Sequence, residues 1–243
     1  MVLVPSGEFM MGIGLDETLA LCKYYYLSAD ICDQKSSIYK DQSPPHLVDL
    51  SSYYIDKYEV TNLQYAACVD AGMCSLPEVI SSGSRDIYYG NPTYDNYPVS
   101  VNWDQSNSFC EWRDARLPTE AEWEKAARGT GERVFPWGDA INCENANFSN
   151  CGGSMNTLPV GSYEKGKSPY EVYDMAGNYS EFVSDWYGSD YYQNSPSLNP
   201  TGPATGEYHV IRGGGNGNFG YFLSSVYRGK GDSGGFRCAK DAP

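Results

Sequence analysis

The stretch Arg116-Leu117-Pro118-Thr119-Glu120-Ala121-Glu122-Trp123-Glu124 combines a stop signal, a helix start and an apolar anchor. The proline ends whatever element precedes it. Thr119 can cap the next helix, and Glu122 stands three residues later at the capping-box position. The three glutamates suit the positive end of the helix dipole, while Trp123 begins a narrow apolar face. We therefore expect a helix that starts after Thr119 and packs through that face on a sheet or another helix.

Patterns on either side of this helix predict a fold that mixes helices and short strands. Capping signals at Thr61 and Asn102 start two further helices. Residues 13–45 show no clear period and are expected to form a long loop. No internal repeat or linker is visible, so we expect one α+β domain with few helices over residues 1–243. Strands are expected within residues 2–12, 46–60, 159–163, 209–214 and 235–239.

The composition excludes two classes of partner. The chain has 243 residues and a formal net charge of −14, from 17 basic and 31 acidic side chains. No cluster of Lys or Arg is present to bind phosphates, so we expect neither nucleic acid nor an anionic membrane surface as a partner. No apolar run is long enough for membrane insertion, and residues 1–7 do not have the pattern of a secretory leader. An acidic surface does suit calcium and solubility.

Eight cysteines, an even number without a Cys-x-x-Cys motif, favour disulfides over a zinc site. Their spacing suggests three local pairs and leaves one long-range pair, which would contribute about 4 kcal/mol in the chain-entropy model. The alternative is a set of buried free thiols. Disulfides would favour an extracellular, cell-surface or virion location. The expected pairs are Cys22 with Cys32, Cys68 with Cys74, Cys143 with Cys151, and Cys110 with Cys238.

Ordered motifs along nearly the whole chain resemble one known family, the formylglycine-generating-enzyme (sulfatase-modifying factor) domain. The resemblance implies an irregular α+β, C-type-lectin-like fold with few helices around small antiparallel sheets. It also implies a disulfide between Cys110 and Cys238. One departure is Ala127, where another family cysteine would stand. The motifs are Val4–Gly12, Tyr58–Tyr65, Tyr97–Val99, Cys110–Trp112, Arg116–Glu124, Phe135–Gly138, Pro159–Gly161, Tyr173–Asn178, Arg212–Gly214 and Gly235–Ala239.

The chain departs from the catalytic members of that family at the site of their chemistry. Those members carry two copper-binding cysteines near the C-terminus, in the interval that corresponds to residues 215–234. This interval contains no cysteine here. Without a thiol there is no thiolate to bind copper or to react, so we expect neither copper nor enzyme activity. The rival hypotheses are an oxidoreductase that acts on a cysteine peptide and a purely structural module of a larger protein.

Residues 215–233 indicate another role, because they mix Gly, Asn, Phe, Tyr, Ser, Lys and Asp without a period. Binding loops use such mixtures of rigid aromatic anchors and small polar groups. The segment resembles the variable region of diversity-generating retroelement variable proteins, which share the fold. This resemblance implies a non-catalytic recognition protein, expected to be a monomer, whose C-terminal face binds a protein or cell-surface ligand; an ordinary glycine-rich loop is the alternative. The expected contacts are Asn216, Asn218, Phe219, Tyr221, Phe222, Tyr227, Lys230 and Asp232.

A structural calcium site is expected in the turn at residues 174–181. Two carboxylates flank a glycine turn there, and calcium prefers such oxygen ligands together with backbone carbonyls. The family resemblance implies this site and a second one; hydrogen-bonded turns are the alternative for both. The expected ligands are the side chains of Asp174 and Glu181 with the carbonyls of Gly177 and Tyr179, and, in the second site, Asn147 with the carbonyl of Phe148.

Overall fold

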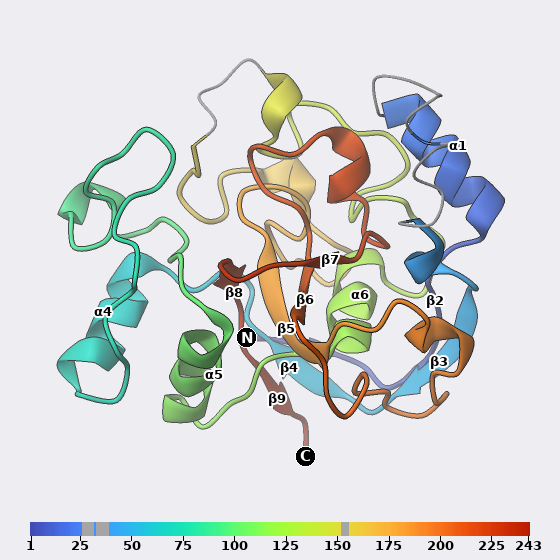
Figure 1. The fold of residues 1–243 in the computed structure, drawn as a ribbon, viewed down its shortest axis with the longest axis horizontal. Coiled ribbons are helices and arrows are strands. Elements are labelled where there is room, and N and C mark those ends of the chain that lie inside the picture. The colour runs from blue at the N-terminus through green and yellow to red at the C-terminus, as the bar shows by residue number, and fades with distance from the viewer. Residues whose placement is uncertain (26–31, 33–38, 152–155) are drawn as a thin grey trace.

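The computed structural model arranges short helices and small sheets around the helix expected after Thr119 (Figure 1). It describes residues 1–25, 32, 39–151 and 156–243. The helices are α1 (Leu15–Tyr25), α4 (Asn62–Asp70), α5 (Trp103–Trp112) and α6 (Glu120–Arg128). The short 3₁₀ helices are η1 (Lys40–Gln42), η2 (Pro92–Tyr94), η3 (Ser149–Cys151), η4 (Glu164–Gly166), η5 (Tyr191–Gln193) and η6 (Gly220–Leu223).

Strands from distant parts of the chain form three small sheets. The first has the order β1-β4-β9, so that β4 pairs with strands from both ends of the sequence; the second is the pair β2-β3. The third has the order β7-β6-β5-β8, in which only β5 and β8 run parallel. The strands are β1 (Val2–Val4), β2 (Gly7–Met11), β3 (His46–Leu50), β4 (Tyr53–Ile55), β5 (Glu181–Trp186), β6 (His209–Arg212), β7 (Gly229–Lys230), β8 (Gly235–Phe236) and β9 (Ala239–Asp241).

Helix α6 begins as its sequence predicts. The Thr119 hydroxyl accepts a hydrogen bond from the Glu122 amide at 3.1 Å, and the Glu122 carboxylate accepts one from the Thr119 amide at 2.8 Å. Trp123 is fully buried among residues of the largest core cluster. The expectation of a single narrow apolar face is wrong, however, because every residue of α6 is buried. Its acidic side chains meet arginines from other elements, so the helix is a central element of the fold.

The other two predicted helices also start at capping boxes. Thr61 caps α4 and Asn102 caps α5, each paired with a glutamine three residues later. The prediction of a loop at residues 13–45 is wrong where α1 forms; part of that interval lies outside the described residues. Helix α1 buries Thr18 and Cys22, four residues apart, and has acidic residues in its first turn. The four-residue spacing of Thr18 and Cys22 was the sequence signal for this helix.

Residues 159–163 form a turn, so the strand expected there is wrong. Gly161 has a φ of +75°, which a regular strand does not allow. The Val160 amide donates to the Asn96 carbonyl, and the Gly161 amide donates to the Asp174 carboxylate. The two backbone amides therefore donate to a loop carbonyl and a side-chain carboxylate rather than to a neighbouring strand.

Four disulfides join all eight cysteines of the sequence in the pairs that the spacing suggested. The Cys110–Cys238 bridge ties α5 to the segment between β8 and β9, and the other three close local loops. Within the described residues, no helix is both long and apolar enough to cross a membrane.

Candidate ligand-binding face

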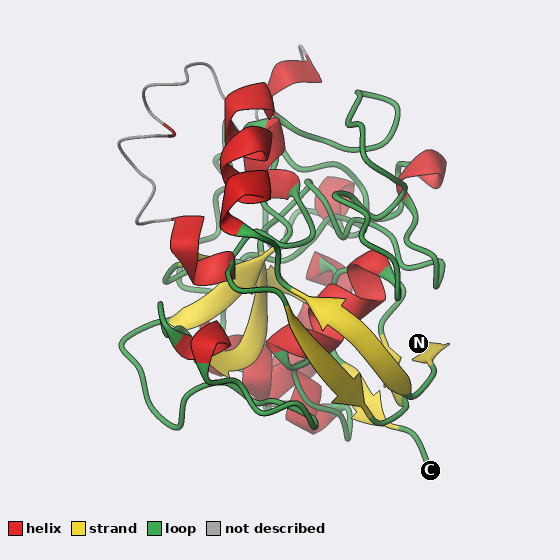
Figure 2. Cartoon of the chain, turned by 90° about the vertical axis from the view of Figure 1, so that its right-hand side faces the viewer, coloured by secondary structure: helices red, strands yellow, loops and turns green. Residues whose placement is uncertain are grey.

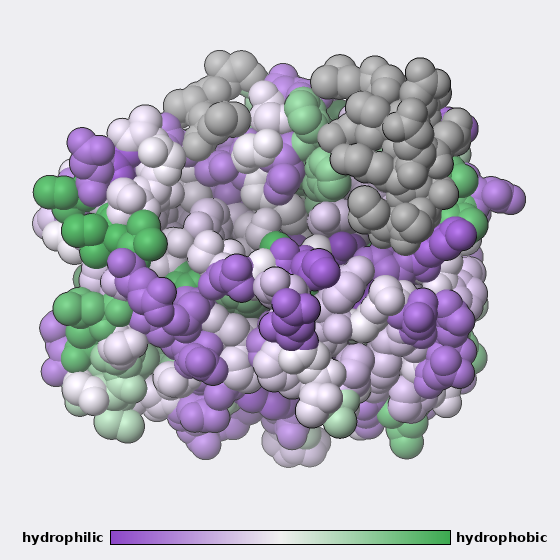
Figure 3. All heavy atoms as spheres, viewed as in Figure 1, coloured by the Kyte–Doolittle hydropathy of each residue, from purple (hydrophilic) through white to green (hydrophobic). Residues whose placement is uncertain are grey.

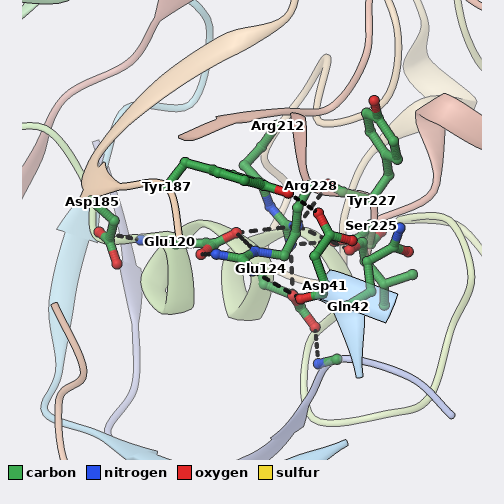
Figure 4. A network of polar contacts seen from close by, with 12 residues as sticks. Asp41, Gln42, Glu120, Glu124, Asp185, Tyr187, Arg212, Ser225, Tyr227 and Arg228 are labelled. Atoms are coloured by element: carbon green, nitrogen blue, oxygen red, sulfur yellow. Dashed lines mark hydrogen bonds and ion pairs between the residues drawn. The ribbon is translucent and has the colours of Figure 1, made fainter. Parts of the chain in front are cut away.

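Residues 215–233, here called the C-terminal face, rest on α6 through two buried arginines (Figure 4). Arg228 donates to both oxygens of Glu120, at 2.7 and 2.9 Å. Arg212, at the end of β6, donates to Glu124 at 2.6 Å. These four side chains are 0–1% exposed. Charge-assisted pairs of this kind are strong and directional, so they fix the C-terminal face to the central helix.

The same arginines hold the backbone of the C-terminal face. Arg212 donates to three successive carbonyls, at 2.7 Å for Ser225, 3.0 Å for Val226 and 2.6 Å for Tyr227. Arg228 donates to the carbonyls of residues 41 and 188 at 2.8 and 3.1 Å. Residues 225–228 therefore form a rigid floor. The sequence marks only one side of this floor, the glutamates at positions 120 and 124, four residues apart on one helix.

Two further carboxyls in this network have raised pKa values. The Asp185 carboxylate accepts a hydrogen bond from the Glu120 amide at 2.9 Å. Burial, reinforced by the negative charge of Glu120, raises the pKa of Asp185 to about 7. Burial also raises the pKa of Asp41, whose carboxylate accepts a hydrogen bond from Tyr187 at 2.7 Å. Protonation of these groups would limit the number of negative charges beneath the C-terminal face.

One of the eight expected contacts is a core residue. Tyr221 is 0% exposed, and its hydroxyl accepts a hydrogen bond from Gln42 at 2.8 Å. Its ring lies edge-on to that of Tyr39, beside the Cys22–Cys32 disulfide. The prediction of Tyr221 as a surface contact is therefore wrong, because the 3₁₀ helix η6 turns this side chain inward.

The other seven expected contacts are at least partly accessible. Lys230 and Asp232 are exposed, and Lys230 lies on the edge strand β7 with its ammonium 5.1 Å from the ring centroids of Tyr187 and Tyr208. Asn218 accepts a hydrogen bond from the Gly215 amide at 2.7 Å and so shapes its own turn. The half-buried residues are Asn216, Asn218, Phe219, Phe222 and Tyr227.

The surface above this floor is mainly polar. Figure 3 shows the side of the molecule that carries η6 and β7, where hydrophilic and neutral residues predominate and apolar residues gather at the left edge, near α4. Phe222 and Tyr227 supply aromatic area, with their rings edge-to-face at 5.1 Å. A mixture of polar groups and a few aromatic anchors is typical of reversible protein interfaces.

The turn expected to bind calcium is buried and crowded with charge. Glu181 accepts hydrogen bonds from Trp123 at 2.8 Å and from Arg237 at 2.6 and 2.7 Å. The Asp174 carboxylate accepts one from the Gly161 amide at 2.6 Å. Burial raises the pKa of Asp174 to about 6. Among the described residues, one oxygen of Glu181 accepts a single hydrogen bond, so the carboxylate retains capacity for another partner.

Glu59 adds a third carboxyl to this cluster. It accepts hydrogen bonds from the Asn178 side chain at 2.7 Å and from the Tyr179 amide at 3.1 Å, and so holds the glycine turn. Burial, and then the charges of Asp174 and Glu181, raise the pKa of Glu59 well above its ordinary value. Three carboxyls around the single guanidinium of Arg237 suit a divalent cation in charge and donor type. Within the described residues, however, no group of three or more acidic, His or Cys side chains is already arranged around one metal position.

The residues of the second expected site, Asn147 and Phe148, take part in hydrogen bonds of neighbouring turns. The Asn147 carbonyl accepts a hydrogen bond from the Asn178 amide at 3.0 Å, and the Phe148 carbonyl accepts one from the Cys151 amide at 3.2 Å. The Asn147 side chain donates to the Asn156 carbonyl at 2.9 Å. Asn147 therefore contacts the first turn directly through Asn178, whereas Phe148 closes a local turn with Cys151.

Comparison with known proteins fits this architecture. Residues 1–242 match the family described as the sulfatase-modifying factor enzyme 1-like domain. The chain belongs to this family. The formylglycine-generating enzyme of Streptomyces coelicolor is 31% identical over an alignment of 265 positions. The alignment covers 88% of this chain and 77% of the enzyme. The serine/threonine-protein kinase pkn1 of Chlamydia caviae is 35% identical over 230 residues, which cover 83% of this chain but only 35% of the kinase.

Solved structures show the same fold. Treponema denticola variable protein 1 superimposes with a TM-score of 0.73 at 22% identity, covering 100% of this chain and 95% of that protein. PvdO from Pseudomonas aeruginosa gives a TM-score of 0.73 at 24% identity, covering 99% and 93%. The expected irregular α+β, C-type-lectin-like fold is therefore confirmed, as is the resemblance to variable proteins.

Proposed function

We propose that this chain is a non-catalytic recognition protein that binds a protein or cell-surface ligand through residues 215–233, as a monomer. The observation that carries the proposal is the division of the C-terminal face into a fixed floor and an accessible layer. Arg212 and Arg228 hold residues 225–228 on α6. The partly or fully accessible side chains of the face can then change without loss of the fold, and they include that of Tyr227, of which the floor uses only the backbone carbonyl. A diversifiable binding surface requires this arrangement.

Cysteine chemistry supports the absence of catalysis. The C-terminal face contains no cysteine, and Cys238, which follows it, is bonded to Cys110. A disulfide-bonded sulfur is not a thiolate and cannot serve as a copper ligand or nucleophile of the kind found in formylglycine-generating enzymes. The rival function remains testable: oxygen uptake with copper and a cysteine peptide, at a rate above that of the denatured protein, would favour an oxidoreductase.

Population sequencing of the codons for residues 205–243 tests the proposal directly. We expect substitutions to concentrate at the accessible positions 216, 218, 219, 222, 227, 230 and 232. We expect Arg212, Tyr221 and Arg228 to stay constant, because their side chains are buried. An interval as invariant as residues 116–124 would contradict diversification. Substitutions spread evenly over buried and accessible positions would contradict the division on which the proposal rests.

Stability measurements on purified variants provide a matched control. Lys230→Ala and Asp232→Ala remove exposed side chains and should leave the melting temperature within about 1–2 °C of the parent, since surface substitutions change stability by roughly 0.5 kcal/mol or less. Tyr221→Ala removes a buried aromatic ring and should cost about 3–5 kcal/mol. If the exposed and the buried substitutions lower the stability equally, the division into accessible and buried side chains is contradicted.

We also propose a structural calcium ion at the turn of residues 174–181. Asp174 and Glu181 would supply carboxylate oxygens, and Gly177 and Tyr179 would supply carbonyls. The excess of negative charge around Arg237 supports this assignment, because a bound cation would lower the cost of burying three carboxyls.

A further inference from the structure

A groove that none of residues 215–233 lines lies beside α1. Helix α1 stands above the β2–β3 pair at one side of the molecule (Figure 2), and a groove of about 720 Å³ runs between the helix, the end of β2 and residues 128–139. None of its lining residues belongs to residues 215–233. We call this the α1 groove and define it by Ile13, Leu21, Tyr24, Val134 and their neighbours.

The lining of the α1 groove is apolar with an acidic rim. Its volume lies in the range that ligand-binding pockets occupy. Three carboxylates, those of Glu17, Glu132 and Asp139, line it together with the apolar side chains, and none of them forms an ion pair within the described part of the chain. Glu17 and Asp139 each accept a hydrogen bond from a backbone amide, but their negative charges are not balanced by a cation in the described part of the chain. Such carboxylates beside an apolar surface favour an occupant that carries both apolar groups and positive charge.

Two other features point to an occupant. Tyr24, which lines the groove, is 80% exposed, although a large aromatic side chain normally packs or binds. Its ring can receive a guanidinium or ammonium group. The Arg128 side chain, only 3% exposed, also lines the groove, and its Nε donor has no hydrogen-bond partner among the residues that the structure describes. A carbonyl oxygen from an occupant would satisfy that donor.

We propose that the α1 groove binds a polypeptide segment of a partner, in which apolar residues alternate with Lys or Arg. The apolar side chains would contact Ile13 and Leu21, and the basic side chains would lie at the acidic rim and on Tyr24. A backbone carbonyl would accept the Arg128 Nε–H. A second copy of this chain is the poorer occupant, because each copy carries a net charge of −14.

Selection from a random 12-residue phage-displayed peptide library tests this site. We expect the selected peptides to combine apolar residues with Lys or Arg. In fluorescence anisotropy with one selected, labelled peptide, Glu132→Lys should weaken binding by roughly threefold to tenfold, the effect of reversing one partly screened charge. Tyr24→Ala should also weaken it. Both residues are exposed, so neither variant should disturb folding.

Charge-matched controls distinguish this groove from general attraction to an acidic protein. Asp86→Lys reverses an exposed charge outside the groove and should leave peptide affinity unchanged, as should Lys230→Ala on the C-terminal face. The proposal is overturned if the library yields no peptide, if the selected peptides lack basic residues, or if Asp86→Lys weakens binding as much as Glu132→Lys. Loss of binding in Lys230→Ala would assign the peptide to the C-terminal face instead.

Discussion

The Glu120–Arg228 pair offers the sharpest test of how the C-terminal face is held. Its two charge-assisted hydrogen bonds measure 2.7 and 2.9 Å, and both side chains are 0–1% exposed. Glu120→Gln removes the negative charge and leaves the Arg228 guanidinium in a desolvated site. Loss of one partner of a buried pair costs about 3–5 kcal/mol. In a protein of this size, that corresponds to a fall in melting temperature of roughly 6–20 °C.

A double-mutant cycle separates this coupling from the cost of each substitution. In Glu120→Leu with Arg228→Met, neither charge remains buried alone, so the double variant should be more stable than the sum of the single effects predicts, by at least about 2 kcal/mol. Some cost persists because the carbonyls of Asp41 and Gly188 lose their donor. Urea denaturation followed by near-ultraviolet circular dichroism, without reductant, measures the four proteins of the cycle and the Glu120→Gln variant. Additive effects, or a cost below about 1 kcal/mol for Glu120→Gln, would refute the reasoning.

Three further predictions concern a disulfide, a buried acid and calcium. Replacing Cys110 and Cys238 by serine opens a link across 128 residues and should cost about 4–5 kcal/mol in urea denaturation; a loss below about 1 kcal/mol would contradict the chain-entropy argument. The folded-state pKa of Asp185 is about 7 against 3.8 ordinarily, so its stabilising contribution is full below about pH 4 and is lost as the pH rises to 7. This loss lowers the free energy of unfolding of the parent by on the order of 4 kcal/mol between pH 4 and 8, and Asp185→Asn should abolish that decline. If the stability of Asp185→Asn varies with pH as that of the parent does, the raised pKa of Asp185 is contradicted. A chelator should lower the melting temperature and added calcium should restore it, whereas no shift would count against calcium at residues 174–181.

Local signals in the sequence were sufficient for most helix starts and for the family. A capping box needs only residues a few positions apart, which is why Thr61, Asn102 and Thr119 each marked a helix start correctly. The floor of the C-terminal face, residues 225–228, was not predictable in this way. Arg212 and Arg228 find their partners on α6, about 90 to 110 residues away, and no local pattern encodes that contact.

Tyr221 shows the limit of reading a binding surface from composition. Its type and position match those of Phe222 and Tyr227, yet η6 buries it while leaving the other two partly accessible. A tyrosine supplies the same chemistry in a core and at an interface. Only the direction in which the backbone turns decides between the two, and that direction depends on packing against residues 39–42.

The strand order has a consequence for how the chain is made. Strand β4 pairs with β1 on one side and with β9 on the other, and β8 lies parallel to β5. During synthesis at about 5–20 residues per second, residues 2–4 leave the ribosome tens of seconds before residues 235–241. The first sheet is therefore completed only after residues 239–241 have emerged. Until then β4 lacks one of its two neighbouring strands, and Cys110 lacks its disulfide partner.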